Sequence, residues 1–121
     1  MSTILVIDDE DLLQDLMVHV LSSEGHEILK ASDGKEGVEM ARKHIPDLII
    51  TDMSMPKMTG WQMIEVLRKD ERTKAIPIIA LTAHKTTDDH IAGYAAGVDD
   101  YEEKPVNMAR LKGKIAKLLK A

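Results

Sequence analysis

The chain has 121 residues, 44% hydrophobic and 31% charged, so it can bury one core but is short for two domains. Its net charge of −5 argues against a general nucleic-acid binder, because such a protein needs a basic surface. The absence of cysteine excludes disulfides, thiolate metal sites and cysteine nucleophiles, and no apolar run approaches the roughly 18 residues of a membrane span.

The first third of the chain predicts two strands, each followed by a helix. Residues 4–7 form a continuous apolar run, which is typical of a buried strand. Apolar residues recur at helical spacing over 13–21, and Gly25 is placed to end that helix. A second strand is predicted at 27–31, and the second helix begins after the Asp33-Gly34 turn.

The rest of the chain continues the same alternation. A third strand is predicted at 48–50, and the capping-box spacing of Thr59-Gly60-Trp61-Gln62 opens a third helix. Pro77 precedes a fourth strand at 78–81, and a helix from about Thr87 to Gly97 leads to a fifth strand at 98–103. The last helix carries one apolar stripe, and its basic residues are expected on a solvated face. The stripe consists of Met108, Leu111, Ile115 and Leu118.

Alternating strands and helices predict an α/β fold with a parallel sheet covered on both faces, a doubly wound (βα)5 arrangement. The strands at 27–31 and 98–103 are the more polar ones and belong at the edges. Right-handed crossovers then favour the strand order 2-1-3-4-5. We expect residues 1–121 to form a single domain without an output domain.

Polar residues stand where four of these strands end. Asp8 and Asp9 follow the first strand, Asp52 the third, Thr82 the fourth and Lys104 the fifth. Ligands of open parallel sheets bind beyond these carboxyl ends, so the side chains should converge. Carboxylates this close repel unless they are protonated or bound to a metal, and their oxygens suit Mg²⁺, or Mn²⁺ in its place. With a hydroxyl and an ammonium added, the site could hold a phosphoryl group.

Four motifs at these strand ends resemble one family. They are Ile7-Asp8-Asp9-Glu10, Asp52-Met53-Ser54-Met55-Pro56 with Gly60, Leu81-Thr82-Ala83, and Asp100-Tyr101 with Lys104-Pro105. Together they resemble the receiver domain of bacterial two-component response regulators, over essentially the whole chain. The resemblance implies a flavodoxin-like fold and a stand-alone regulator of the chemotaxis or phosphorelay type.

The resemblance also implies how the acidic residues would act. Asp52 would be the phosphoacceptor. Asp9, Asp52 and the backbone carbonyl of Ser54 would bind Mg²⁺ directly, and Asp8 would act through a metal-bound water. Ser54 and His84 occupy the positions that tune autodephosphorylation in the family.

The remaining motif residues would serve phosphoryl binding and switching. By the same resemblance, Thr82 and Lys104 would hold phosphoryl oxygens, and Tyr101 would turn inward as Thr82 moves. The bond between Lys104 and Pro105 would be cis. The implied partners are a sensor histidine kinase or a histidine phosphotransfer protein, and a downstream protein bound through the fourth helix, fifth strand and fifth helix. We expect the protein to be cytoplasmic, and we expect neither direct DNA binding nor membrane association.

Two residues depart from the pattern of many relatives. Glu102 stands where an apolar residue is common, so its carboxylate must reach solvent, gain a partner or weaken the edge strand. Val106 replaces the phenylalanine that often follows the Lys-Pro pair. Both changes concern the expected output surface, not the phosphorylation chemistry.

Three other functions compete with this interpretation. A phosphatase of the haloacid dehalogenase type would use similar groups, but it carries its nucleophile in an Asp-x-Asp motif after the first strand, where this chain has Asp8-Asp9-Glu10. A flavodoxin-like cofactor binder should have a phosphate loop rich in Ser, Thr and Gly there. A constitutive docking module would not need Asp52 at all. Each acid taken alone could also be an ordinary cap or turn residue.

Overall fold

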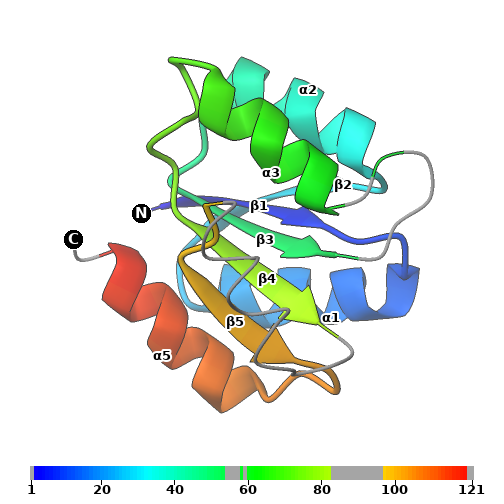
Figure 1. Cartoon of the computed structure of the whole chain (residues 1–121). Coiled ribbons are helices and arrows are strands. Elements are labelled where there is room, and N and C mark those ends of the chain that lie inside the picture. Colours follow the sequence, from blue (N-terminus) through cyan, green and yellow to red (C-terminus); the bar gives the residue numbers. More distant parts are fainter. Residues whose placement is uncertain (1, 54–57, 59, 83–96, 120–121) are drawn as a thin grey trace.

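Five parallel strands form one sheet in the order β2-β1-β3-β4-β5, as predicted (Figure 1). The computed structural model describes residues 2–53, 58, 60–82 and 97–119. The strands are β1 (Thr3–Ile7), β2 (Glu27–Ala31), β3 (Leu48–Asp52), β4 (Ile78–Thr82) and β5 (Asp100–Glu103). The polar strands β2 and β5 lie at the two edges, which confirms the argument from strand polarity.

The described helices cover both faces of this sheet. They are α1 (Asp11–Ser23), α2 (Gly34–His44), α3 (Gly60–Lys69) and α5 (Met108–Leu119). In Figure 1, α2 and α3 lie on one face of the sheet, and α1 and α5 lie on the other. The helix predicted from Thr87 falls outside the described residues, as does Thr59 of the predicted capping box. None of the helices in the described part of the chain has the length and hydropathy to cross a membrane.

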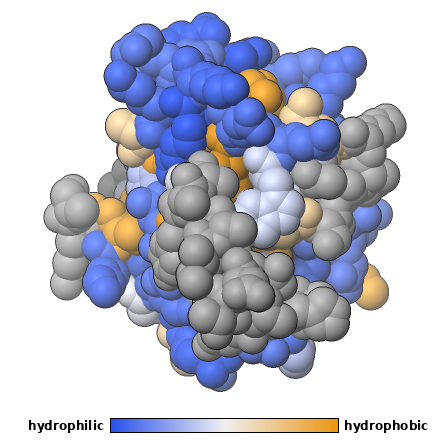
Figure 2. Space-filling view, viewed as in Figure 1, coloured by the Kyte–Doolittle hydropathy of each residue, from blue (hydrophilic) through white to orange (hydrophobic). Residues whose placement is uncertain are grey.

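Alternate residues of the inner strands divide the core into two clusters. Leu5 and Ile7 of β1 pack with α2 and α3, whereas Ile4 and Val6 pack with α1 and α5. This alternation explains why the inner strands are apolar on both faces until they reach their polar carboxyl ends at Thr51-Asp52 and Thr82. Among the coloured residues on the face shown in Figure 2, hydrophobic ones occupy small, separate areas.

Two local features differ from the predictions. The buried positions of α1 are Gln14, Met17 and Leu21, so Leu16 of the predicted apolar repeat is 48% exposed. Strand β5 begins at Asp100, two residues later than predicted. Asp99 still contacts the first residue of β4, because its backbone N–H donates to the Ile78 carbonyl at 2.9 Å and its carboxylate accepts the Ile78 N–H at 2.8 Å.

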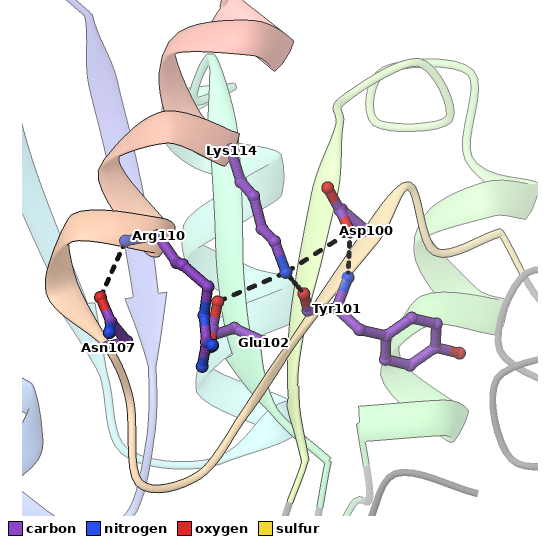
Figure 3. A network of polar contacts seen from close by, with 6 residues as sticks. All are labelled: Asp100, Tyr101, Glu102, Asn107, Arg110 and Lys114. Atoms are coloured by element: carbon purple, nitrogen blue, oxygen red, sulfur yellow. Dashed lines mark hydrogen bonds and ion pairs between the residues drawn. The ribbon is translucent and has the colours of Figure 1, made fainter.

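The basic residues of α5 are partly exposed, but three of them have acidic partners. Lys112 Nζ lies 2.8 Å from Glu24 Oε1 at the end of α1. Arg110 and Lys114 both pair with Glu102 on β5 (Figure 3). The predicted solvated basic face is therefore only part of the description, because these ion pairs also connect α5 to β5 and α1.

Glu102 is almost fully buried on the edge strand β5, and its carboxylate lies beside two cations. Its Oε1 atom lies 2.9 Å from Arg110 Nη2, and its Oε2 atom lies 3.3 Å from Lys114 Nζ in an ion pair without hydrogen-bond geometry. The Lys114 ammonium also donates to the backbone carbonyl of Tyr101 and lies 3.8 Å from Asp100 Oδ1. The Glu102 carboxylate therefore neither reaches solvent nor stays unpaired in the edge strand, because it gains basic partners.

Two glycines predict opposite responses to alanine. Gly113 lies inside α5, where an added methyl group meets no atom within 4 Å, so Gly113→Ala should stabilise the protein by about 0.5–1 kcal/mol. Gly25 also has space, but its φ of 91° is strained for any other residue, so Gly25→Ala should destabilise by about 1 kcal/mol. Urea unfolding of the two variants measures both effects. A stabilising Gly25→Ala would contradict the backbone argument.

Candidate active site

Three carboxylates meet where β1 and β3 end. One oxygen from each of Asp8, Asp9 and Asp52 can be chosen so that all three lie within 4.8 Å of one another. Asp8 is fully buried and Asp52 is 7% exposed, whereas Asp9 is exposed. The strands explain the meeting, because β1 and β3 are paired neighbours whose last paired residues are Ile7 and Thr51, directly before Asp8 and Asp52. The predicted convergence of these acids is confirmed.

The cation and the hydroxyl lie at the same edge of the sheet. Lys104 Nζ is 3.4 Å from Asp52 Oδ2 and 3.7 Å from Asp8 Oδ2. The Lys104 backbone N–H donates to the Thr82 carbonyl at 2.7 Å, so β5 leaves the sheet directly beside Thr82. The Lys104-Pro105 bond is cis, as the resemblance implied.

Burial and charge make this site unfavourable for isolated anions. Desolvation raises the pKa of Asp8, with smaller upward contributions from Asp52 and Asp9, while the Glu10 N–H and Lys104 act in the opposite direction. Asp8 Oδ1 accepts the Glu10 N–H at 2.8 Å, but Asp8 Oδ2 accepts no hydrogen bond from the described residues. The buried hydroxyl of Thr82 likewise has no hydrogen-bond partner among them. An oxygen-binding divalent cation next to these acids, with an oxyanion at Thr82, fits this donor set.

Of the other residues expected at the site, Tyr101 is described by the structure, whereas Ser54 and His84 are not. Tyr101 is 4% exposed on β5, opposite Ala80 of β4, and its ring points away from Lys114 in Figure 3. Ser54 and His84 lie outside the described residues. Sequence reasoning missed Gln14, which is buried beside the acidic turn. Its signal was a polar residue at helical spacing with Met17 and Leu21.

The raised pKa of Asp8 predicts a stabilising substitution. We expect Asp8→Asn to raise the free energy of unfolding of the metal-free protein at neutral pH, because it removes a buried charge but keeps the acceptor for the Glu10 N–H. The folded wild type holds the proton more tightly than the unfolded chain, so its stability falls as pH rises above 3.8 towards the raised pKa.

The gain from Asp8→Asn should therefore disappear in acid, where both states of the wild type are protonated. Urea unfolding at several pH values, with a chelator present, measures the difference. A destabilising effect at neutral pH would show that the Lys104 pair outweighs the burial of the charge.

Comparisons with known proteins agree on one family. The family model for the response regulator receiver domain matches residues 4–116. The chain is 37% identical to Protein PilH of Pseudomonas aeruginosa over 107 residues, or 88% of each protein. It is 38% identical to the "DNA-binding dual master transcriptional regulator RpaA" of Synechocystis over 120 residues, 99% of this chain.

The chain spans about half the length of most of these curated relatives, including RpaA, of which it covers 50%. Among solved structures, it is similar to the receiver domain of the sensor histidine kinase PA1611 from Pseudomonas aeruginosa. That structure has 28% sequence identity and a TM-score of 0.91, with 99% of this chain and 98% of the other covered. It is described as having a magnesium ion coordinated in its active-site cleft.

Proposed function

The chain belongs to the family of response regulator receiver domains, and from this membership we propose that it is a phosphorylation switch whose phosphoacceptor is Asp52. The observation that carries the proposal is the position of Asp52. It is nearly buried, shares a possible metal site with Asp8 and Asp9, and lies 3.4 Å from the Lys104 ammonium. A carboxylate held between a cation and a metal site is placed to attack an electrophilic phosphorus.

Mg²⁺ would be held by Asp9, Asp52 and the backbone carbonyl of Ser54, with Asp8 acting through water. When bound, it would supply positive charge that offsets the three acids and the phosphoryl oxygens. Mn²⁺ offers similar oxygen-binding chemistry. Support comes from the grouping of Asp8, Asp9 and Asp52, and from the magnesium described for the PA1611 receiver domain.

The transfer step uses the residues at the strand ends. A carboxylate oxygen of Asp52 attacks the phosphorus of a phosphohistidine, the new O–P bond forms as the P–N bond breaks, and the imidazole leaves with the electron pair and takes a proton. Lys104 and the Thr82 hydroxyl bind phosphoryl oxygens as charge moves onto them. Water later cleaves the acyl phosphate, a step that Ser54 and His84 would tune.

The output of this switch is a change in affinity for a protein partner. Thr82 ends β4 and Tyr101 is buried on the neighbouring β5, so a phosphoryl group at Thr82 can change the packing around Tyr101. A modest free-energy difference between two conformations is enough for phosphorylation to change their populations. We assign the downstream surface to the side of β5 and α5, and place the protein in the cytoplasm.

The direct test is incubation with acetyl phosphate, with and without Mg²⁺, followed by intact-mass analysis. We expect one phosphoryl adduct on the wild-type protein, formed only with the metal. Absence of an adduct from acetyl phosphate and from every phosphohistidine donor tried would falsify the mechanism. Steady turnover of small phosphate esters would instead favour a phosphatase.

A hollow beside the site indicates how a protein donor would dock. It has a volume of about 480 Å³ and lies between α1 and residues 104–106, which connect β5 to α5. Its lining residues are Glu10, Leu13, Leu16, Lys104, Pro105 and Val106. On α1, Leu12 is 82% exposed and Leu16 is 48% exposed. Exposed leucines next to a phosphoacceptor suit an apolar helix that presents the phosphohistidine.

We therefore expect Leu12→Gln combined with Leu16→Gln to slow transfer from a phosphohistidine protein at least about tenfold, as loss of interface anchors would. Phosphorylation by acetyl phosphate should not change, because that donor needs no protein surface. The matched control is Ile45→Gln, which removes another exposed hydrophobic residue, at the end of α2. An equal loss of transfer in the control, or none in the double variant, would remove α1 from the donor surface.

A further inference from the structure

We propose that Gln14 is a positioning residue that holds the Asp8-Asp9 turn in the geometry needed for metal binding. The proposal rests on the function proposed above and adds a residue to its site. Gln14 lies on α1 and is 4% exposed, although its side chain is an amide. A buried amide is costly unless it is hydrogen bonded, so its partners show what it does.

The side chain of Gln14 binds the point where β1 leaves the sheet. Its Nε2 atom donates to the Ala31 carbonyl at 2.9 Å and to the Val6 carbonyl at 3.3 Å. Ala31 is the last residue of β2 paired with β1, opposite Ile7. The same Ala31 carbonyl accepts the backbone N–H of Asp8 at 3.1 Å. The Gln14 amide and the Asp8 main chain thus share one acceptor.

The backbone of Gln14 reaches the same aspartate by a second route. The Gln14 N–H donates to the Glu10 carbonyl at 3.1 Å, and the Glu10 N–H donates to Asp8 Oδ1 at 2.8 Å. The contacts form a closed ring from Asp8 through Ala31, Gln14 and Glu10 back to Asp8. Gln14 joins the two halves of the ring. Its side chain shares the Ala31 carbonyl with the Asp8 main chain, and its backbone binds Glu10, which holds the Asp8 carboxylate.

The ring has a consequence for the neighbouring metal site. With Oδ1 occupied by the Glu10 N–H, the second oxygen of Asp8 accepts no hydrogen bond from the described residues. Asp9, between Asp8 and Glu10, lies within the turn that the ring encloses. Partners behind metal ligands orient them, and losing one typically weakens metal binding by about 10–100-fold. Gln14 would act in this way on Asp8 and Asp9 without touching the metal.

The test compares Gln14→Met with Leu21→Val. Methionine keeps the length of the side chain but cannot donate to Val6 and Ala31. Leu21 is buried on the same helix, and its shortening costs stability without breaking the ring. Isothermal titration with Mg²⁺ should show affinity about tenfold weaker for Gln14→Met. For Leu21→Val, the affinity should equal that of the wild type, with the unfolding free energies of both variants measured in urea.

A second measurement does not depend on the metal. Amide hydrogen exchange at Asp8 and Glu10, in the presence of a chelator, should accelerate in Gln14→Met more than in Leu21→Val, because both N–H groups donate within the ring. Wild-type Mg²⁺ affinity in Gln14→Met would overturn the proposal, as would unchanged exchange at these two amides. Failure of the wild type to bind Mg²⁺ would count against the proposed function, and the exchange result would still decide whether Gln14 holds the turn.

Discussion

Asp52→Asn should abolish the phosphoryl adduct that the wild-type protein is expected to form with acetyl phosphate and Mg²⁺. The amide cannot form an acyl phosphate, and it is a weaker ligand for a hard cation than a carboxylate. Asp8 and Asp9, each with a carboxylate oxygen within 4.8 Å of one on Asp52, remain in the variant, so the result tests Asp52 itself and not the acidity of the region. Intact-mass analysis over a time course measures the loss.

The matched control is Asp47→Asn at the opposite end of the same strand. Asp47 precedes β3 and accepts the Thr3 N–H at 2.8 Å, whereas Asp52 ends β3 inside the site. Asp47→Asn should therefore phosphorylate like the wild type. An adduct that persists in Asp52→Asn and maps to another residue would move the phosphoacceptor elsewhere. Loss of the adduct in the control would indicate a general effect on folding.

The combined substitution Arg110→Met and Lys114→Met should lower the free energy of unfolding by about 3 kcal/mol. These residues bring the two cations next to Glu102, whose side chain is 1% exposed (Figure 3). Without them the carboxylate stays buried and uncompensated. Arg110 is 62% exposed at its side chain, so most of the loss should come from Lys114, which also donates to the Tyr101 carbonyl.

A third substitution separates charge from packing. Adding Glu102→Leu to the double variant removes the buried anion, and stability should return to within about 1 kcal/mol of the wild type or exceed it. Urea unfolding of the wild type, the double variant and the triple variant provides the comparison. If the triple variant is as unstable as the double variant, the packing of the Arg110 and Lys114 side chains is responsible and the buried charge is not.

The strand order and the position of the site followed from features that are local along the chain. Continuous apolar runs such as 4–7, alternating with helical periodicity, imply a covered parallel sheet, and the handedness of its connections restricts the strand order. Parallel strands end at one edge, so Asp8, Asp52 and Lys104 could be brought together without coordinates.

Contacts between side chains could not be predicted from strand and helix patterns in the sequence. Glu102 had three possible outcomes in the sequence, and the choice depended on where α5 places Arg110 and Lys114. The role of Gln14 was hidden, because its amide meets carbonyls from two strands distant in the chain from one another. Backbone periodicity depends on nearest neighbours, whereas these pairings depend on the packing of separate elements to within a few ångströms.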